Sequence, residues 1–224
     1  MSRHAKAPCV LLLIAMGSVT VGAQPEEPAP LARLELLLTT TPGLPEAART
    51  SMMAEAEAIW ATQGVVIDWL PPTASITPSR NRLRVFVVER RQSGSTQGDA
   101  FTVGELMRPL NGHPVAMMSI ESAQRLLTSV RGRAGYDLIA VDRRRLGVVL
   151  GRALAHEIGH YLLETHTHAR DGLMRPQFNA LEFTERRHET FLLDRKASDW
   201  LKSRLALSPV SGPAAEHSQF AYVR

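Results

Sequence analysis

Five consecutive residues, His156-Glu157-Ile158-Gly159-His160, carry the clearest chemistry in this sequence of 224 residues. In a helix, histidines four positions apart lie on the same face, so both imidazoles can reach one metal ion. Glu157 lies about a quarter-turn round the helix from His156, where its carboxylate can take a proton from a metal-activated water without binding the metal. We therefore predict that His156 and His160 are zinc ligands and that Glu157 is the catalytic general base.

The residues behind this motif supply candidates for a third ligand. Three protein ligands leave the fourth position of a tetrahedral zinc open for water, which is the arrangement of a catalytic site. His166 and His168 both follow within eight residues of His160. Glu164 lies four residues after His160, and we interpret it as a solvated cap residue or a partner of an imidazole rather than a ligand.

With these residues the sequence resembles the metzincin branch of the zinc peptidases, in which the motif HExxHxxGxxH is followed by a turn with a methionine beneath the metal. The matches are His156, Glu157, His160, a later histidine, and Met174 within Gly172-Leu173-Met174. The resemblance implies an α/β (α+β) zincin-like single domain with a small mixed sheet packed on an active-site helix, a Met-turn and a C-terminal helix. It also implies hydrolysis of a peptide or protein substrate, and a structural role for Met174.

The chain departs from the metzincin pattern at Leu163, where that family has glycine. The glycine lets the helix end in a left-handed conformation, which costs other residues about 1–2 kcal/mol. We therefore expect the helix to continue past Leu163 and His168 to be the third ligand, with His166, at the family spacing, as the alternative. The sequence is also similar to small secreted bacterial HExxH proteins, mostly uncharacterised, in which a histidine follows the second ligand by eight residues; this resemblance favours His168.

The elements that position these side chains are predicted from hydrophobic periodicity and from the Gly and Pro residues that interrupt helices and strands. Extended segments are predicted at 31–40, 65–70, 82–89, 100–107 and 115–120. Helices are predicted at 45–63, from 119 or 121 to 131, at 143–164, which carries the motif, and at 184–205. In the motif helix, Gly151 and Gly159 allow close packing. The family resemblance implies that 115–120 is the cleft-side edge strand, which pairs with a substrate backbone.

The N-terminus has the pattern of a secretory signal. Arg3 and Lys6 precede an apolar run at 10–21, and Val21-Gly22-Ala23 offers small residues for cleavage. We predict a signal peptide at 1–23, a flexible leader at 24–30, a catalytic domain at 31–206 and a flexible tail at 207–224, in a secreted or periplasmic protein. An uncleaved anchor is the alternative. Because Cys9 is the sole cysteine, the cleaved chain would have neither disulfides nor thiolate ligands.

The composition limits the other function classes. With 44% apolar and 21% charged residues the chain is typical of a globular domain, and its net charge of +4 does not indicate a nucleic-acid partner. No Gly-x-Ser-x-Gly elbow is present. The competing hypothesis is a catalytically inactive zincin-fold periplasmic binding or interaction protein, which would not need Glu157. We expect a monomer without stable membrane insertion once the signal is cleaved.

Overall fold

A computed structural model describes residues 30–74, 81–90, 102–109, 113–134, 139–185 and 189–207. The predicted signal peptide and all but the last residue of the predicted leader lie outside the described residues, as does all but the first residue of the predicted tail. The described residues form the predicted α/β architecture, in which helices pack on a five-stranded mixed sheet.

The sheet has the strand order β2-β1-β3-β5-β4. Its four parallel strands are β1 (Ala32–Thr40), β2 (Val65–Leu70), β3 (Arg82–Val88) and β5 (Val115–Ser119). The fifth strand, β4 (Gly104–Met107), pairs antiparallel with β5. Alternate residues face the helices: in β3, Leu83, Val85 and Val87 are buried while their neighbours are partly exposed.

The prediction that 115–120 forms the edge strand is wrong. The strand β5 lies between β3 and β4, and Ala116 faces Val85 on one side and Leu106 on the other. The edge is β4, because this short strand folds back antiparallel on the strand that follows it in the chain. The sequence predicts extended structure for both β4 and β5, and only the order of strand pairing shows which of the two lies inside the sheet.

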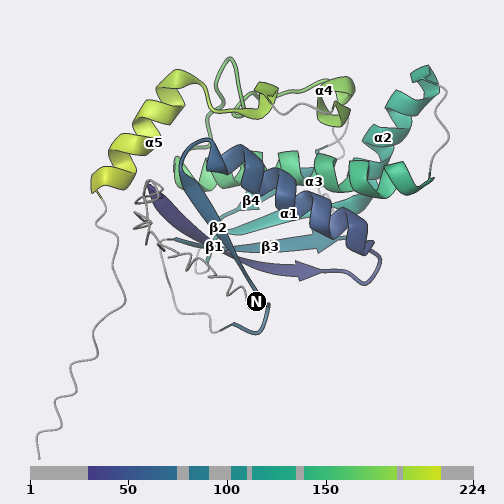
Figure 1. Ribbon diagram of the computed structural model, residues 1–224, viewed down its shortest axis with the longest axis horizontal. Helices are drawn as coiled ribbons and strands as arrows, with labels where there is room; N and C mark the ends of the chain where they lie inside the picture. The colour runs from purple at the N-terminus through teal and green to yellow at the C-terminus, as the bar shows by residue number, and fades with distance from the viewer. Residues whose placement is uncertain are drawn as a thin grey trace, which may run out of the picture.

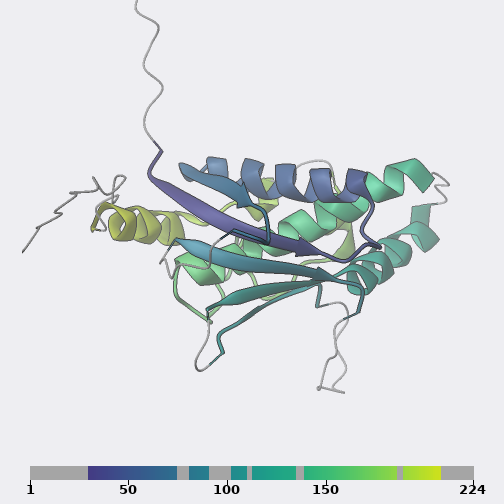
Figure 2. The same cartoon turned by 90° about the horizontal axis from the view of Figure 1, so that it is seen from below.

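Two helices, α1 (Glu46–Ala61) and α3 (Ile139–Leu162), lie on the same side of the sheet (Figures 1 and 2). They are in close contact: a Cβ atom at Gly151 would lie 2.7 Å from the Met52 carbonyl oxygen. The fully buried Trp60 donates from Nε1 to the Ala155 carbonyl at 3.2 Å. This packing fixes the helix that carries the HExxH motif against α1.

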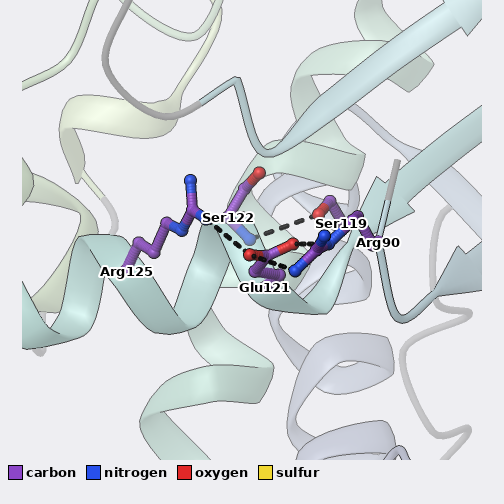
Figure 3. A network of polar contacts seen from close by, with 5 residues as sticks. All are labelled: Arg90, Ser119, Glu121, Ser122 and Arg125. Carbon is purple, nitrogen blue, oxygen red and sulfur yellow. Dashed lines mark hydrogen bonds and ion pairs between the residues drawn. The ribbon is translucent and has the colours of Figure 1, made fainter. Parts of the chain in front are cut away.

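The helix α2 (Ile120–Ala134) starts between the two predicted positions, with Ser119 as its N-terminal cap (Figure 3). The Ser119 Oγ atom accepts a hydrogen bond from the Ser122 backbone N–H at 3.2 Å. The Glu121 carboxylate pairs with Arg90, just beyond β3, at 2.6 Å and with Arg125 at 2.5 Å. These contacts tie the start of α2 to the ends of β3 and β5.

The C-terminal part differs from the single helix predicted at 184–205. It consists of α4 (Ala180–Thr184), a 3-10 turn η1 (Glu189–Phe191) and α5 (Arg195–Leu207). The helix begins late because the preceding residues have other contacts: Phe191 is fully buried, and the Leu192 carbonyl accepts from the Leu173 N–H at 2.6 Å. Asp194 then caps α5 by accepting from the Ala197 N–H at 2.7 Å.

Among the described helices, none is both long and apolar enough to cross a lipid bilayer.

Candidate metal centre

Three histidine side chains converge at the C-terminal end of α3. His156 and His160 come from the last two turns of the helix and His168 from the loop behind it. One ring nitrogen from each lies within 4.8 Å of the others, an arrangement that can hold a metal ion. His166 is exposed and lies outside this group. Of the two candidates for a third ligand, the fold therefore brings His168 to the helical pair.

Backbone carbonyl groups orient the two helical imidazoles. The Nδ1 atom of His156 lies 2.6 Å from the Leu173 oxygen, and that of His160 lies 2.8 Å from the Thr165 oxygen. Because a carbonyl only accepts, both Nδ1 atoms must carry the proton, and each neutral ring then presents a lone pair at Nε2. The metal-binding tautomer is thus set by the backbone, as is usual for histidine ligands.

The two Nε2 atoms face each other at 3.0 Å. Two lone pairs at this separation repel unless a cation lies between them. Ligands at the usual Zn–N distance of about 2.0–2.1 Å, arranged tetrahedrally, are about 3.3 Å apart, close to the separation seen here. The donor set of three imidazoles is also one that zinc accepts in catalytic sites. The residues present therefore fit zinc.

Burial keeps these rings neutral. It lowers the pKa of His156 from 6.5 to about 4, against the smaller raising effect of the hydrogen bond to Leu173. Burial also lowers the pKa of His160. A histidine must be neutral to bind a metal, so both rings are in the binding form at neutral pH.

The helix ends at Leu162 and does not extend to Glu164 as predicted. The Leu163 N–H still donates to the Gly159 carbonyl at 2.9 Å, and Glu164 then takes a left-handed conformation with a φ angle of 47°. The left-handed residue thus comes one position after the one where metzincins have glycine. The Glu164 carboxylate forms an ion pair with Arg204 of α5 and is not part of the histidine cluster.

Met174 packs beneath the helix between the two histidine turns. It is 2% exposed, and a Cβ atom at Gly159 would lie 2.3 Å from its Sδ atom. The residue before it, Leu173, supplies the carbonyl that orients His156. Gly159 is therefore needed for Met174 to reach the helix backbone, and the turn at 171–174 supports the cluster from below.

Glu157 is 6% exposed and lies beside the edge strand. A Cβ atom at Gly104, the first residue of β4, would lie 3.1 Å from the Glu157 Cγ atom and 3.3 Å from its Oε1 atom. The nearest neighbour of this Cβ atom would be the Met118 Cε atom at 2.3 Å, so the glycine makes room for both side chains. Sequence reasoning missed Gly104, for which the only signal is a glycine inside an extended segment.

No protein-family model and no curated protein sequence matches the chain. Among solved structures, the chain is similar to archaemetzincin from Methanopyrus kandleri, with 15% sequence identity and a TM-score of 0.49. The match covers 79% of this chain and 97% of that chain.

Proposed function

We propose that this protein is a zinc-dependent peptidase, with His156, His160 and His168 as metal ligands and Glu157 as the general base. The observation that carries the proposal is the convergence of three imidazoles, two of which have their Nε2 lone pairs aimed at each other at 3.0 Å by carbonyl contacts at Nδ1. Bound zinc supplies a Lewis acid that lowers the pKa of water and polarises a carbonyl group.

Glu157 performs the proton transfer in this proposal. It follows His156 directly on α3, and its burial against Gly104 restricts where the carboxylate can lie. The carboxylate accepts a proton from the attacking water and then donates it to the leaving amine of the cleaved peptide. A structural metal site has no use for this buried carboxylate, which is why we favour a peptidase over a binding protein.

The edge strand β4 is the element that we propose to bind the substrate backbone. It is the outer strand of the described sheet, and an added strand would continue the antiparallel pairing that β4 makes with β5. Its first residue, Gly104, lies near the proposed base, since a Cβ atom there would be 3.1 Å from Glu157 Cγ. A peptide on this edge would therefore pass close to Glu157.

The decisive experiment compares zinc content with cleavage of an unbiased peptide library, for wild type and Glu157→Gln. We expect about one zinc per chain in both proteins, and cleavage only by wild type, because the carboxamide cannot accept the proton. Wild-type protein that holds zinc but cleaves nothing would refute the peptidase and favour the binding protein.

The assignment of the third ligand is tested separately by competitive chelator titration. His168→Ala should weaken zinc binding by several orders of magnitude, since two imidazoles do not complete the site. His166→Ala is the matched control and should change the affinity by about a hundredfold at most. The reverse order would overturn the assignment of His168.

We further propose that the protein is exported, on the basis of the signal-like segment at 1–23. Intact-mass measurement of the secreted or periplasmic fraction should give a chain that begins at Gln24. A mass that includes residues 1–23 would refute cleavage.

A further inference from the structure

Four side chains stack in a row beside the histidine cluster. The Arg175 guanidinium lies over the Phe178 ring, with 4.3 Å from Cζ to the ring centroid. The rings of Phe178 and Phe191 are stacked, with centroids 4.6 Å apart and an interplanar angle of 12°. The Arg152 guanidinium lies over Phe191 at 4.7 Å. We call these four residues the Arg–Phe stack.

Both ends of the Arg–Phe stack are held by Glu182 of α4. The fully buried Arg152 donates from Nη1 to the Glu182 carbonyl at 2.6 Å and pairs with Glu55 of α1 at 2.7 Å. Arg175 donates from Nη2 to the Glu182 carboxylate at 3.0 Å. The same carboxylate accepts from the Asn179 N–H at the start of α4. The stack therefore joins α1, α3, α4 and the segment behind Met174 into one rigid unit.

Phe178 connects this unit to the proposed metal ligand His156. The two rings are nearly perpendicular, at 88°, with centroids 6.3 Å apart, which is within the range of edge-to-face aromatic contacts. The hydrogen bond from Nδ1 to Leu173 fixes one atom of the imidazole, so the ring can rock only about that contact, within the limits set by the neighbouring His160 and His168 rings. A perpendicular ring packed beside it opposes this rocking motion.

We infer that Phe178 is a positioning residue for His156: held in the Arg–Phe stack, it keeps the imidazole turned so that Nε2 points to the metal position. Where it concerns zinc, the inference rests on the proposed function. It goes beyond that function because it assigns a role to a side chain that belongs neither to the ligand set nor to the HExxH motif.

The experiment compares Phe178→Leu with Phe183→Leu. Phe183 lies in the same aromatic cluster, and its ring centroid is 5.4 Å from that of Phe178 and 5.2 Å from that of Phe191. Among the described residues, Phe183 makes no ring contact with His156. Both variants lose a ring from the same cluster, so thermal unfolding of the metal-free proteins measures the shared structural effect. Phe178→Tyr keeps the ring and should restore wild-type behaviour.

Zinc affinity and the visible spectrum of the cobalt-substituted protein give the first readout. Phe178→Leu should bind zinc about tenfold more weakly and show an altered cobalt spectrum, as expected for loss of a residue that orients a ligand. Phe183→Leu and Phe178→Tyr should match wild type in both. Equal affinities and spectra for the two leucine variants would overturn the inference.

A second readout does not depend on metal binding. In the metal-free protein, long-range proton–nitrogen NMR should show one His156 tautomer, protonated at Nδ1, in wild type and Phe183→Leu. In Phe178→Leu the ring signals of His156 should shift or broaden as the imidazole rocks more freely, while Nδ1 stays protonated by its contact with the Leu173 carbonyl. Absence of zinc binding in wild type would refute the proposed function alone, whereas an unchanged His156 spectrum in Phe178→Leu would refute the positioning role.

Discussion

Lowering the pH of the metal-free protein should destabilise it in part through His156. The pKa of this group is about 4 in the folded protein, chiefly because of burial, against 6.5 for an unperturbed histidine. The unfolded chain therefore takes up the proton first as the pH falls. The contribution of His156 to stability is complete above pH ~6.5, declines as the pH falls from there to ~4, and is constant at lower pH.

The size of this effect follows from the two pKa values. The fall in the pKa of His156 from 6.5 to about 4 corresponds to a loss of about 3 kcal/mol when His156 is protonated in both states. At pH ~5, where the unfolded form is almost fully protonated and the folded form is not, the expected loss is about 2 kcal/mol. For a domain that is stable by about 5–15 kcal/mol, such a loss is easily measured.

Urea unfolding in the presence of a chelator, at pH ~7 and ~5, measures the loss. The variant His156→Gln has no proton to take up at this position, so the stability lost between the two pH values should be smaller than in wild type by about 2 kcal/mol. The loss that remains in His156→Gln includes the contribution of His160, whose pKa burial also lowers. If wild type and His156→Gln lose equal stability, the burial argument for His156 is refuted.

Three further perturbations test the supports of the site. Gly104→Ala should reduce peptide cleavage at least about tenfold while zinc affinity stays within a few-fold of wild type, because the new Cβ atom would lie 2.3 Å from Met118 Cε and 3.1 Å from Glu157 Cγ and would displace the carboxylate. Parallel kinetic and chelator assays check this, and unchanged cleavage would contradict it. Ser119→Ala should cost about 1 kcal/mol in urea unfolding through loss of the cap on α2, and a cost near zero would count against that cap. Glu164→Gly should be more stable than Glu164→Ala by about 1 kcal/mol, because both variants lose the ion pair with Arg204 but only glycine adopts a φ angle of 47° without strain. Thermal unfolding measures the difference, and the opposite order would refute the left-handed conformation at the end of α3.

The sequence by itself determined the elements and the core of the proposed site. Hydrophobic periodicity located the five extended segments and the helix that carries the HExxH motif to within a few residues. Helical geometry alone puts His156 and His160 on one face, because their spacing of four residues is a local property of the chain. The pattern also predicts close packing at Gly159, where Met174 occupies the space that a side chain would fill.

The tertiary structure decided whatever depends on contacts between distant segments. Pairing order made β4 rather than β5 the edge, and the left-handed Glu164 set where the loop to His168 begins. The segment 184–205 does not form one helix despite its amphipathic pattern, because burial of Phe191 against Phe178 outweighs local helix propensity. These outcomes are set by burial and hydrogen bonding across the fold, which local periodicity does not encode.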